Sequence, residues 1–382
     1  MSDDDLKQDD GVTQSPPPKD DPVVLSKAAA ARVQSAYEAR RAKNIATSTI
    51  SLVVLFALFV VSLGLGRMLI PPGEILGILL NQWFGIPGDF SQGNITIVMN
   101  VRLPRICAAM LCGAALALAG AAYQGLFKNP MVSPDILGAS AGASFGAALA
   151  IMLTGGNNSV VSAMAFGMGF AAVLITYFAS KRVSKGSANM TLLLVLCGLI
   201  VQTLFQSFVS IIKYVADPND TLPTITYWLM GSIAKVTWGD LSVFIIPFIL
   251  GTVPLLLLRW RLNTLAFGDA EAEALGVNVR LLRAILIVCS TLLTASVVAI
   301  AGVVGRVGLI IPHVVRFLTG PDNRTVIPLS LVFGAGFLMI VDTCCRSMMA
   351  YEIPLGILTS IIGAPFFFYI LLRTSRSGGG SK

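Results

Sequence analysis

The sequence predicts an all-α polytopic membrane protein with about ten transmembrane helices and two inverted repeats. Three observations lead to this fold class. The 382 residues are 55% hydrophobic and only 12% charged, with a mean hydropathy of +0.79, whereas a soluble domain carries about 25% charged residues. Ten apolar runs follow one another, and ten spans of about 20 residues need roughly 200 residues. A short pattern also recurs in the two halves of the chain.

The first 42 residues are polar and low in aromatic residues, with an acidic start. We expect residues 1–42 to form a disordered cytoplasmic tail that turns helical from Leu25 through the alanines. No cleavable signal peptide is expected, because the first apolar run begins only after Arg40, Arg41 and Lys43 and no small-residue cleavage site follows it.

A single transmembrane domain is expected over residues 43–374, followed by a short cytoplasmic tail at 375–382. The third and eighth apolar runs are short and adjoin Pro or Gly, so they are the two least expected to cross the membrane fully. The expected runs lie at 45–69, 103–126, 135–153, 159–180, 190–213, 240–259, 282–301, 305–319, 327–347 and 355–373.

The stretch from Arg102 to Gly142 differs from a simple membrane anchor. Its apolar part is rich in Gly, Ala and Ser, which let helix backbones approach closely. An Asn129-Pro130 break and a second proline, Pro134, then interrupt it at membrane depth. Irregular backbone at that depth is tolerated only where it is buried in protein or lines an aqueous path. The stretch therefore predicts a transport protein.

The basic residues in the loops predict the orientation. Lys and Arg gather mainly on one side, which includes Arg259 and Arg280, whereas the other side includes Arg102, Arg105 and Arg346. The positive-inside rule makes the first side cytoplasmic. Both termini are then expected on the cytoplasmic side of the cell membrane, which requires an even number of spans.

A weak internal repeat supports an inverted arrangement. The segment Ala117-Leu-Ala-Gly120 is followed ten residues after its glycine by Pro130, and Ala299-Ile-Ala-Gly302 is followed ten residues after its glycine by Pro312. If five spans separate the copies, the first runs outside-to-inside and the second inside-to-outside, as in many transporters.

Several kinds of chemistry have no support in the sequence. No G-x-x-x-x-G-K-[ST] phosphate-binding loop occurs. Mid-span carboxylates are scarce, with Asp135 beside a break and Asp342 near a span end, so we expect the energy for transport to come from another subunit. An ion-coupled secondary transporter stays open as an alternative, because backbone carbonyls also bind sodium.

No metal site and no catalytic residue are expected in this chain. The six cysteines lie in or beside apolar runs and none forms a C-x-x-C, so they are interpreted as small buried hydrophobes. His313 is the single histidine, which excludes a multi-histidine site within one chain. We interpret His313 as a packing residue and Arg316, three residues later, as a structural residue.

The longest cytoplasmic loop, residues 262–281, predicts a contact with a soluble partner. Gly268 and Gly276 bracket a helix of about two turns, whose acidic residues lie towards its N-terminus, where the helix dipole favours them. A solvated surface helix is the alternative interpretation.

Four stretches together resemble the permease subunits of ATP-binding-cassette importers of the FecCD type, which carry iron–siderophore, haem or cobalamin. They are RLPR with ALAGAAYQGLFKNPMVSPDILGASAGA; YWLMGSIAKVTW; LAFGDAEAEALGV; and GRVGLIIPHVVRFL, which continues into VDTCCRSM and IPLGILTSIIGAPFFFYILLR. The resemblance covers about residues 100–373. It implies the type II ABC importer permease architecture and a homodimer around a central pathway.

The resemblance also implies partners and residue roles. The expected partners are a second copy of the chain, two cytoplasmic ATP-binding-cassette ATPase subunits that hold ATP and Mg, an extracytoplasmic substrate-binding protein and the lipid bilayer, with no nucleic acid. The expected binding-protein docking residues are Arg102, Arg105 and Arg346. The expected ATPase-coupling residues are Leu265, Ala266, Phe267, Gly268, Asp269, Glu271, Ala272, Leu275 and Gly276. The expected residues of a cytoplasmic translocation gate are Asn129, Met131 and Thr191.

The expected function is thus that of a permease subunit, without enzymatic activity, for inward transport of an iron–siderophore-type substrate across the cytoplasmic membrane. The same architecture importing haem or cobalamin is an alternative, since no residue of the sequence discriminates these cargoes.

Overall fold

The fold is helical throughout the part of the chain that the computed structural model describes. These described residues are 22–66, 68–184, 190–349 and 351–378, and their regular secondary structure consists of helices alone. The predicted all-α class is confirmed.

The described helices account for the ten predicted apolar runs. Seven are long and apolar enough to cross a membrane, and three apolar helices are shorter. Two of the shorter helices correspond to the predicted third and eighth runs. The long helices are α1 (Pro22–Gly64), α3–η1–α4 (Gln92–Thr96, Ile97–Arg102 and Leu103–Leu126, continuous), α6 (Asn158–Val183), α7 (Met190–Val215), α9 (Trp238–Leu258), α12 (Val279–Ala301) and α14 (Asn323–Ser347). The shorter ones are α5 (Ala139–Thr154), α13 (Val307–Thr319) and α15 (Leu355–Gly378), which is apolar over Leu355–Phe368.

Helix α1 begins earlier than the sequence analysis predicted. Its backbone is helical from Pro22, three residues before Leu25, where the tail was expected to turn helical. The physical reason is the alanine-rich segment after Leu25, since alanine is the strongest helix former. The rest of that predicted tail, residues 1–21, lies outside the described residues.

The chain forms two compact units, residues 1–49 and residues 50–382. The larger unit contains most of α1's apolar part and every later helix. At its C-terminal end, α15 continues to Gly378, so the last helix takes in the first residues of the predicted tail at 375–382.

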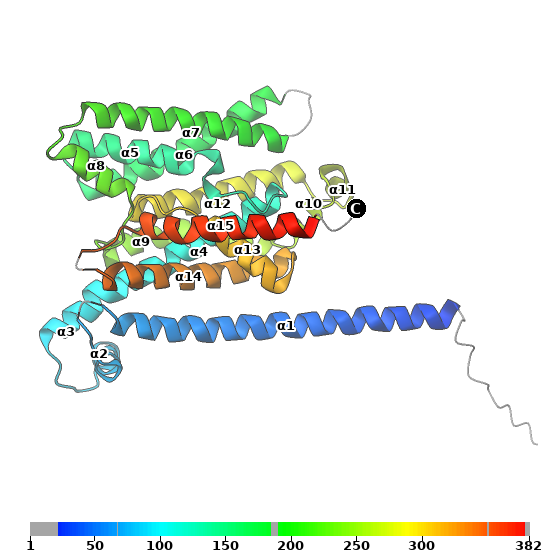
Figure 1. Cartoon of the computed structure of the whole chain (residues 1–382), viewed down its shortest axis with the longest axis horizontal. Helices are drawn as coiled ribbons and strands as arrows, with labels where there is room; N and C mark the ends of the chain where they lie inside the picture. Colours follow the sequence, from blue (N-terminus) through cyan, green and yellow to red (C-terminus); the bar gives the residue numbers. More distant parts are fainter. Residues whose placement is uncertain (1–21, 67, 185–189, 350, 379–382) are drawn as a thin grey trace, which may run out of the picture. The chain divides into compact units, whose positions relative to one another are not determined.

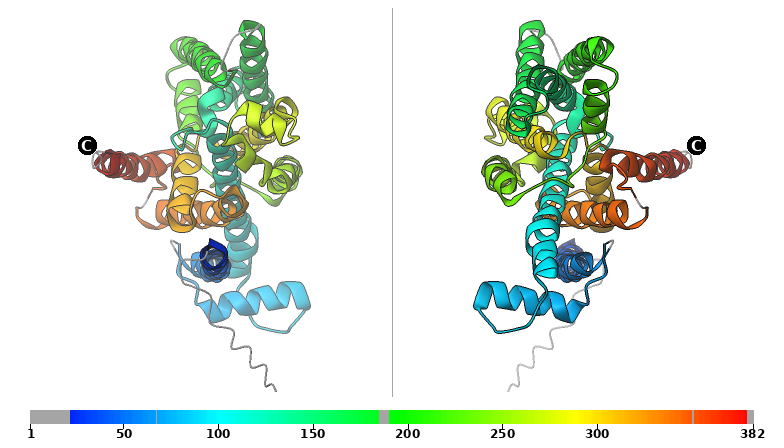
Figure 2. Two further views of the ribbon diagram at one scale, coloured as in Figure 1. Left: turned by 90° about the vertical axis from the view of Figure 1, so that its right-hand side faces the viewer. Right: turned by 90° about the vertical axis from the view of Figure 1, so that its left-hand side faces the viewer.

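Helix α4 lies at the centre of the larger unit, packed against α12, α13 and α14 (Figures 1 and 2). Its small side chains allow this close packing. Gly113 meets the backbone of Gly334 in α14, and Gly120 meets the backbone of Gly308 in α13. A Cβ at either α4 glycine would overlap a main-chain oxygen of the neighbouring helix, so only glycine fits at these two crossings.

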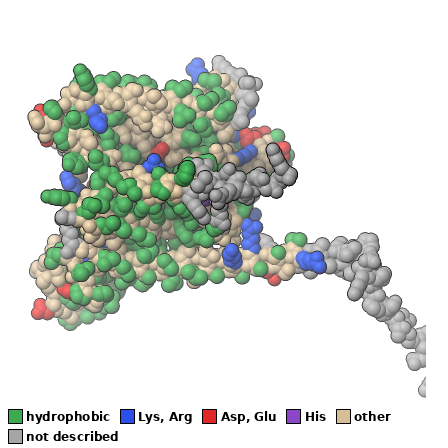
Figure 3. Space-filling model, viewed as in Figure 1, with side chains coloured by type: hydrophobic (Ala, Val, Ile, Leu, Met, Phe, Trp, Pro, Cys, Tyr) green, Lys and Arg blue, Asp and Glu red, His purple; other side chains and the backbone are tan. Residues whose placement is uncertain are grey.

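The outer helices expose apolar surface. Of the most apolar 18-residue window of each helix, 83% is buried in the α3–α4 span but only 28% in α7 and in α9. Hydrophobic side chains accordingly cover much of the face seen in Figure 3. Helices with so much exposed apolar surface are suited to contact lipid or further membrane helices.

Connecting segments of the larger unit gather at two ends (Figure 1). One, here called the α8 end, carries α2 (Pro72–Phe84) and α8 (Thr221–Leu229); the other, the α11 end, carries α10 (Arg261–Leu265) and α11 (Asp269–Ala274). The basic residues at the end of α6, Lys181 and Arg182, belong to the α11 end, which is the side that the charge count predicts to be cytoplasmic.

The two breaks of the predicted repeat lie in helices of opposite direction (Figure 1). Helix α4 runs towards the α11 end, and its break leads through η2 (Pro134–Leu137) into the short α5. Helix α12 runs towards the α8 end, and residues 302–306 lead into the short α13. The opposite directions of these two long-then-short helix pairs agree with an inverted architecture. The matched residues themselves are not equivalent, because Gly120 lies within α4 and Pro130 in the break after it, whereas Gly302 ends α12 and Pro312 lies within α13.

Candidate functional site

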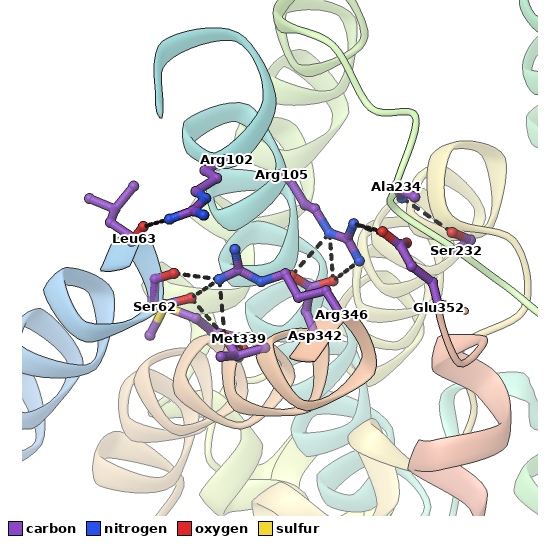
Figure 4. Close-up of polar contacts among 11 residues, drawn as sticks. Ser62, Leu63, Arg102, Arg105, Ser232, Ala234, Met339, Asp342, Arg346 and Glu352 are labelled. Carbon is purple, nitrogen blue, oxygen red and sulfur yellow. Dashed lines mark hydrogen bonds and ion pairs between the residues drawn. The ribbon is translucent and has the colours of Figure 1, made fainter. Parts of the chain in front are cut away.

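A buried cluster of charged side chains lies at the α8 end, where α4 begins and α14 finishes (Figure 4). Arg105 is at its centre. Its Nε donates to both carboxylate oxygens of Asp342, at 2.9 and 3.2 Å, and its Nη2 lies 2.8 Å from Asp342 Oδ1. Its Nη1 donates to both carboxylate oxygens of Glu352, at 2.9 and 3.0 Å. One guanidinium thus joins two carboxylates from separate segments by charge-assisted hydrogen bonds.

Arg346 extends this cluster towards the end of α1. It lies one turn after Asp342 in α14, and its Nε is 3.7 Å from Asp342 Oδ2. Its Nη2 donates to the carbonyl oxygen of Ser62 at 2.5 Å and to the Ser62 hydroxyl at 2.7 Å. The buried Asp342 therefore serves two arginines, which its single negative charge does not fully compensate.

Arg102 caps the C-terminus of α1. Its Nη1 donates to the carbonyl oxygens of Leu63 at 2.6 Å and Gly64 at 3.2 Å, and its Nη2 donates to the carbonyl oxygen of Met68. Carbonyls in the last turn of a helix lack partners within the helix, and a cation there also interacts favourably with the helix dipole.

The three arginines expected to dock a binding protein are therefore buried and internally bonded. Arg102, Arg105 and Arg346 are 5%, 6% and 6% exposed. Their contact with a binding protein stays a prediction; what the structure shows is that they join α1, α4 and α14. The sequence analysis missed Asp342 as their partner, although the four-residue spacing from Asp342 to Arg346 was a usable signal.

The exposed part of this region is the segment between α14 and α15. The Glu352 side chain is 35% exposed, and the nearby Met348, Met349 and Tyr351 are 65%, 63% and 88% exposed. Arg105 thus holds one carboxylate of a segment in which Met348, Met349 and Tyr351 are exposed.

A groove of about 560 Å³ adjoins this segment at the α8 end. Glu352 forms part of its wall, together with Tyr227 and Trp228 of α8 and the charged Lys235 and Asp240 that follow α8. The cluster and the groove therefore share one carboxylate.

A second polar junction joins the two halves of the chain at their breaks. The buried Gln124 of α4 donates from Nε2 to the carbonyl oxygens of Gly308, at 3.4 Å, and Leu309, at 3.2 Å, in α13. Arg316 in α13 donates to Gln124 Oε1 and, at 3.4 Å, to the Ala121 carbonyl oxygen. Arg316 is thus a structural residue, as predicted, whereas the sequence analysis did not single out Gln124.

The predicted gate residues lie on two elements. Asn129 and Met131 follow the end of α4, where the Met131 N–H donates to Asn129 Oδ1 at 2.9 Å and the Met131 side chain is 40% exposed. Thr191 lies in the first turn of α7. Narrowing of a pathway by these residues stays a prediction.

The predicted coupling segment forms two short helices. Leu265 at the end of α10 and Ala272 in α11 are 2% and 0% exposed, whereas Phe267 and Leu275 are 72% and 64% exposed. The segment therefore anchors itself with two apolar side chains and presents two others to the surroundings. The remaining predicted coupling residues that are exposed or part-exposed are Ala266, Gly268, Asp269, Glu271 and Gly276.

Glycines and an ion pair fix the position of α11. Gly268, at its start, has φ +132°, and Gly276, after its end, has φ +79°, both in the region that favours glycine. Asp269 then accepts a hydrogen bond from Arg283 Nη2 of α12 at 2.8 Å. The helix expected between these two glycines is confirmed, and it is tied to a membrane-crossing helix.

Metal-binding geometry is absent from the part of the chain that the structure describes. No group of three His, Cys, Asp or Glu side chains there is placed to hold a metal ion. His313 is half-buried in α13.

Comparison with known proteins places these features in a family. The model of the FecCD transport family matches residues 54–373. The molybdate import permease MolB of Haemophilus influenzae is 39% identical, over 84% of this chain and 93% of its own length. The cobalamin import permease BtuC of Halobacterium salinarum is 39% identical over 75% of each chain. Permeases named for hemin in Yersinia pestis and for ferric citrate in Bacillus subtilis match at 36% and 37% identity.

A solved structure shares the fold. It is an ABC transporter assigned to the metal-chelate type, in an inward-facing conformation, with 36% sequence identity and a TM-score of 0.73. The match covers 85% of this chain and 97% of that one.

Proposed function

The chain belongs to the FecCD transport family, and from this premise we propose that it carries an iron–siderophore-type chelate inward across the cytoplasmic membrane. It is a multi-pass permease subunit of an ABC importer. Its cargo, its partners in the assembly and its orientation are the parts that we propose.

The coupling segment carries the proposal of ATPase partners. Phe267, between α10 and α11, and Leu275, after α11, expose apolar surface on a segment that Leu265 and the Asp269–Arg283 ion pair hold in place. Exposed apolar side chains on an immobilised surface segment are suited to fill a pocket on a soluble partner. We infer that two cytoplasmic ATPase subunits, which hold ATP and Mg, receive this segment from two copies of the chain.

The opposite end supports the proposed contact with an extracytoplasmic binding protein. The exposed Met348, Met349 and Tyr351 belong to the same segment as Glu352, which forms part of the groove wall. Arg105, which binds Glu352, would act on docking through the position of this segment. Direct contacts from Arg102, Arg105 and Arg346 would require the segment to move, because their guanidinium groups are buried.

The proposed mechanism is alternating access driven from outside this chain. Closure of the ATPase pair would move the coupling segments, and the ion pair of α11 with α12 would transmit that displacement to a membrane-crossing helix. The two breaks, joined through Gln124 and Arg316, would then shift the short helices α5 and α13. No covalent step and no cofactor of its own are assigned to this subunit.

The proposed cargo class follows from the family. Relatives are named for ferric citrate, hemin, cobalamin and molybdate, so metal-containing anions and chelates are the shared theme. Iron chelates are our first choice within it, with haem and cobalamin as alternatives for the same machinery.

The coupling proposal is tested by Phe267→Asp. Because Phe267 is exposed, the variant is expected to fold normally, but a carboxylate in an apolar pocket is costly to desolvate. We expect at least a tenfold loss of ATPase subunits copurifying with the permease. The matched control is Tyr214→Asp, which changes another highly exposed aromatic residue, at the end of α7, and should leave copurification unchanged.

Full retention of the ATPase by the Phe267 variant would contradict the coupling role. ATP-driven uptake of iron-55 citrate into proteoliposomes that contain all three components then tests the cargo. Uptake that needs an ion gradient but no ATP would favour the secondary-transporter alternative.

A further inference from the structure

We propose that Arg306 forms an anion-binding site in the translocation pathway, so that the permease selects negatively charged cargo. This inference deepens the proposed function and rests on it. Arg306 lies in the break between α12 and α13, immediately before the first residue of α13. The sequence analysis assigned it no functional role.

Arg306 lies on an exposed face of the chain, some distance along α15 from the start of that helix. Helix α13 has 13 residues, so its far end at Thr319 is about 20 Å away. Arg306 Nη1 donates to the Ser360 hydroxyl of α15 at 2.5 Å. Ser360 is five residues after the start of α15, about 8 Å along its axis. Along the helix axes, α13 therefore extends to one side of Arg306, and the first turns of α15 extend to the other side.

The side chain extends back along α15 by about one turn towards the start of that helix. A Cβ at Gly363 of α15 would lie 2.8 Å from Cδ and 3.0 Å from Cβ of Arg306, so the aliphatic part of the arginine covers Gly363, one turn deeper than Ser360. Arginines near a membrane surface ordinarily direct the charged group out to water. The Arg306 guanidinium follows that direction by one turn, from the level of Gly363 to Ser360, but it stays about 8 Å from the start of α15.

The charge of Arg306 has no counter-ion in the described part of the chain. Ion pairs there involve Arg105, Arg283 and Arg346, and none involves Arg306. Its recorded partner is the neutral Ser360 hydroxyl, and its side chain is exposed. Since an unpaired arginine facing lipid is costly, a charge in such a position indicates an aqueous or substrate pathway.

The surrounding backbone reinforces the positive charge. Arg306 has φ +65°, a strained conformation for a non-glycine residue, which the packing around it must maintain. It stands at the N-terminus of α13, where the helix dipole is positive. In transporters with broken helices, such N-termini point at anionic groups of the substrate.

The surface next to Arg306 is apolar. Ile357, Ile361 and Ile362 of α15 are 39%, 62% and 41% exposed. A cation beside isoleucines suits an amphiphilic anion, such as a ferric chelate with uncompensated carboxylates and an organic shell, and it suits a small oxyanion less well.

The site is tested first by charge-selective labelling, which needs no knowledge of the cargo. Ser360→Cys is made in the full chain within its assembly, and its modification by anionic sulfonatoethyl and cationic trimethylammonioethyl methanethiosulfonate is compared with that of the parent chain. We expect the anionic reagent to be favoured, and the preference to fall at least about fivefold when Arg306→Gln is added.

Two controls accompany the labelling. Arg324→Gln removes an exposed arginine at the start of α14, and it should leave the preference within twofold. Salt should lower the preference in Ser360→Cys itself, without any change at position 306. If the thiol introduced at position 360 were not labelled, or if both reagents reacted equally fast with Arg306 present, the site would be overturned.

Transport then tests selectivity, with ferric citrate, molybdate and cyanocobalamin as probes of different charge. We expect Arg306→Gln to reduce ATP-driven uptake of ferric citrate at least tenfold and Arg306→Lys to retain it within threefold. Equal uptake of ferric citrate by wild type and Arg306→Gln would refute the inference alone. Absence of any ATP-driven uptake by the wild type would count against the proposed function, while the labelling still decides whether the site exists.

Discussion

At the scale of residues, the arrangement of charge inside the membrane domain is the main result. Asp342 is fully buried and neutralises Arg105 while also lying close to Arg346. Buried ion pairs contribute little stability in themselves, but removal of one partner leaves an uncompensated charge. The cluster therefore fixes how α4 and α14 meet, and a carboxylate there is required once the arginines are buried.

Asp342→Asn is expected to destabilise the protein strongly. The amide leaves Arg105 with only Glu352 as a counter-ion and Arg346 with none, at a cost on the order of 3–5 kcal/mol. A lower apparent melting temperature in nanodiscs measures this loss. Glu352→Gln is the matched control, because its side chain is 35% exposed and its loss should matter much less. If Asp342→Asn had the same apparent melting temperature as the wild type, the ion pairs of Asp342 would not contribute to stability.

At the scale of elements, helix α4 depends on glycine where it crosses its neighbours. Gly113 and Gly120 bring the backbones of α14 and α13 close enough to exclude any side chain. The same helix carries Gln124, which binds the α13 backbone. Helix α4 of the first half thus contacts α13 and α14 of the second half through its glycines and through the side-chain amide of Gln124.

Gly120→Ala is expected to disrupt the packing of α4 against α13. Its methyl group would overlap the backbone of Gly308, and two packed helices cannot yield without losing other contacts. We expect a lower melting temperature and reduced coupling between ATP hydrolysis and uptake. Gly167→Ala in α6 is the control, since a Cβ there meets nothing within 4 Å and alanine favours helix. Equal effects of the two substitutions would contradict the packing argument.

At the scale of the whole molecule, an exposed cation on an apolar helix face predicts a larger assembly. Helices α7 and α9 bury only 28% of their most apolar windows within the chain, which suits contact with lipid. Arg306 lies beside exposed isoleucines of α15, where lipid contact alone would be unfavourable for its charge. A second copy of the chain would enclose that surface around an aqueous path.

The permease is therefore expected to purify as a dimer of twice the 40.3 kDa chain mass. Light scattering with correction for bound detergent or lipid measures this mass. Intermolecular crosslinking should be efficient from cysteines introduced on the α15 face near Arg306 and weak from the exposed face of α9. A mass of one chain under conditions that retain ATPase binding would contradict the dimer.

Local residue properties were enough to establish the class of the molecule. Apolar runs of about membrane length, separated by short basic loops, allow little other than a helical membrane domain, because backbone groups in lipid must be satisfied within the helix. The Asn129-Pro130 break and the short helix between Gly268 and Gly276 were also readable from the sequence, since each depends on the residues at that place in the chain.

Only the folded chain shows which arginines are buried and which groups they contact. Arg102 and Arg105 stand at the start of a span, and local sequence cannot tell an arginine exposed at a membrane surface from one buried against Asp342, which is 237 residues away from Arg105 along the chain. Arg306 is a second case, because its sequence context is that of a loop cation, whereas its side chain lies along α15 beside exposed isoleucines. The physical reason is the same in both cases: the free energy of a charge depends on its surroundings in space, and chain folding supplies those surroundings.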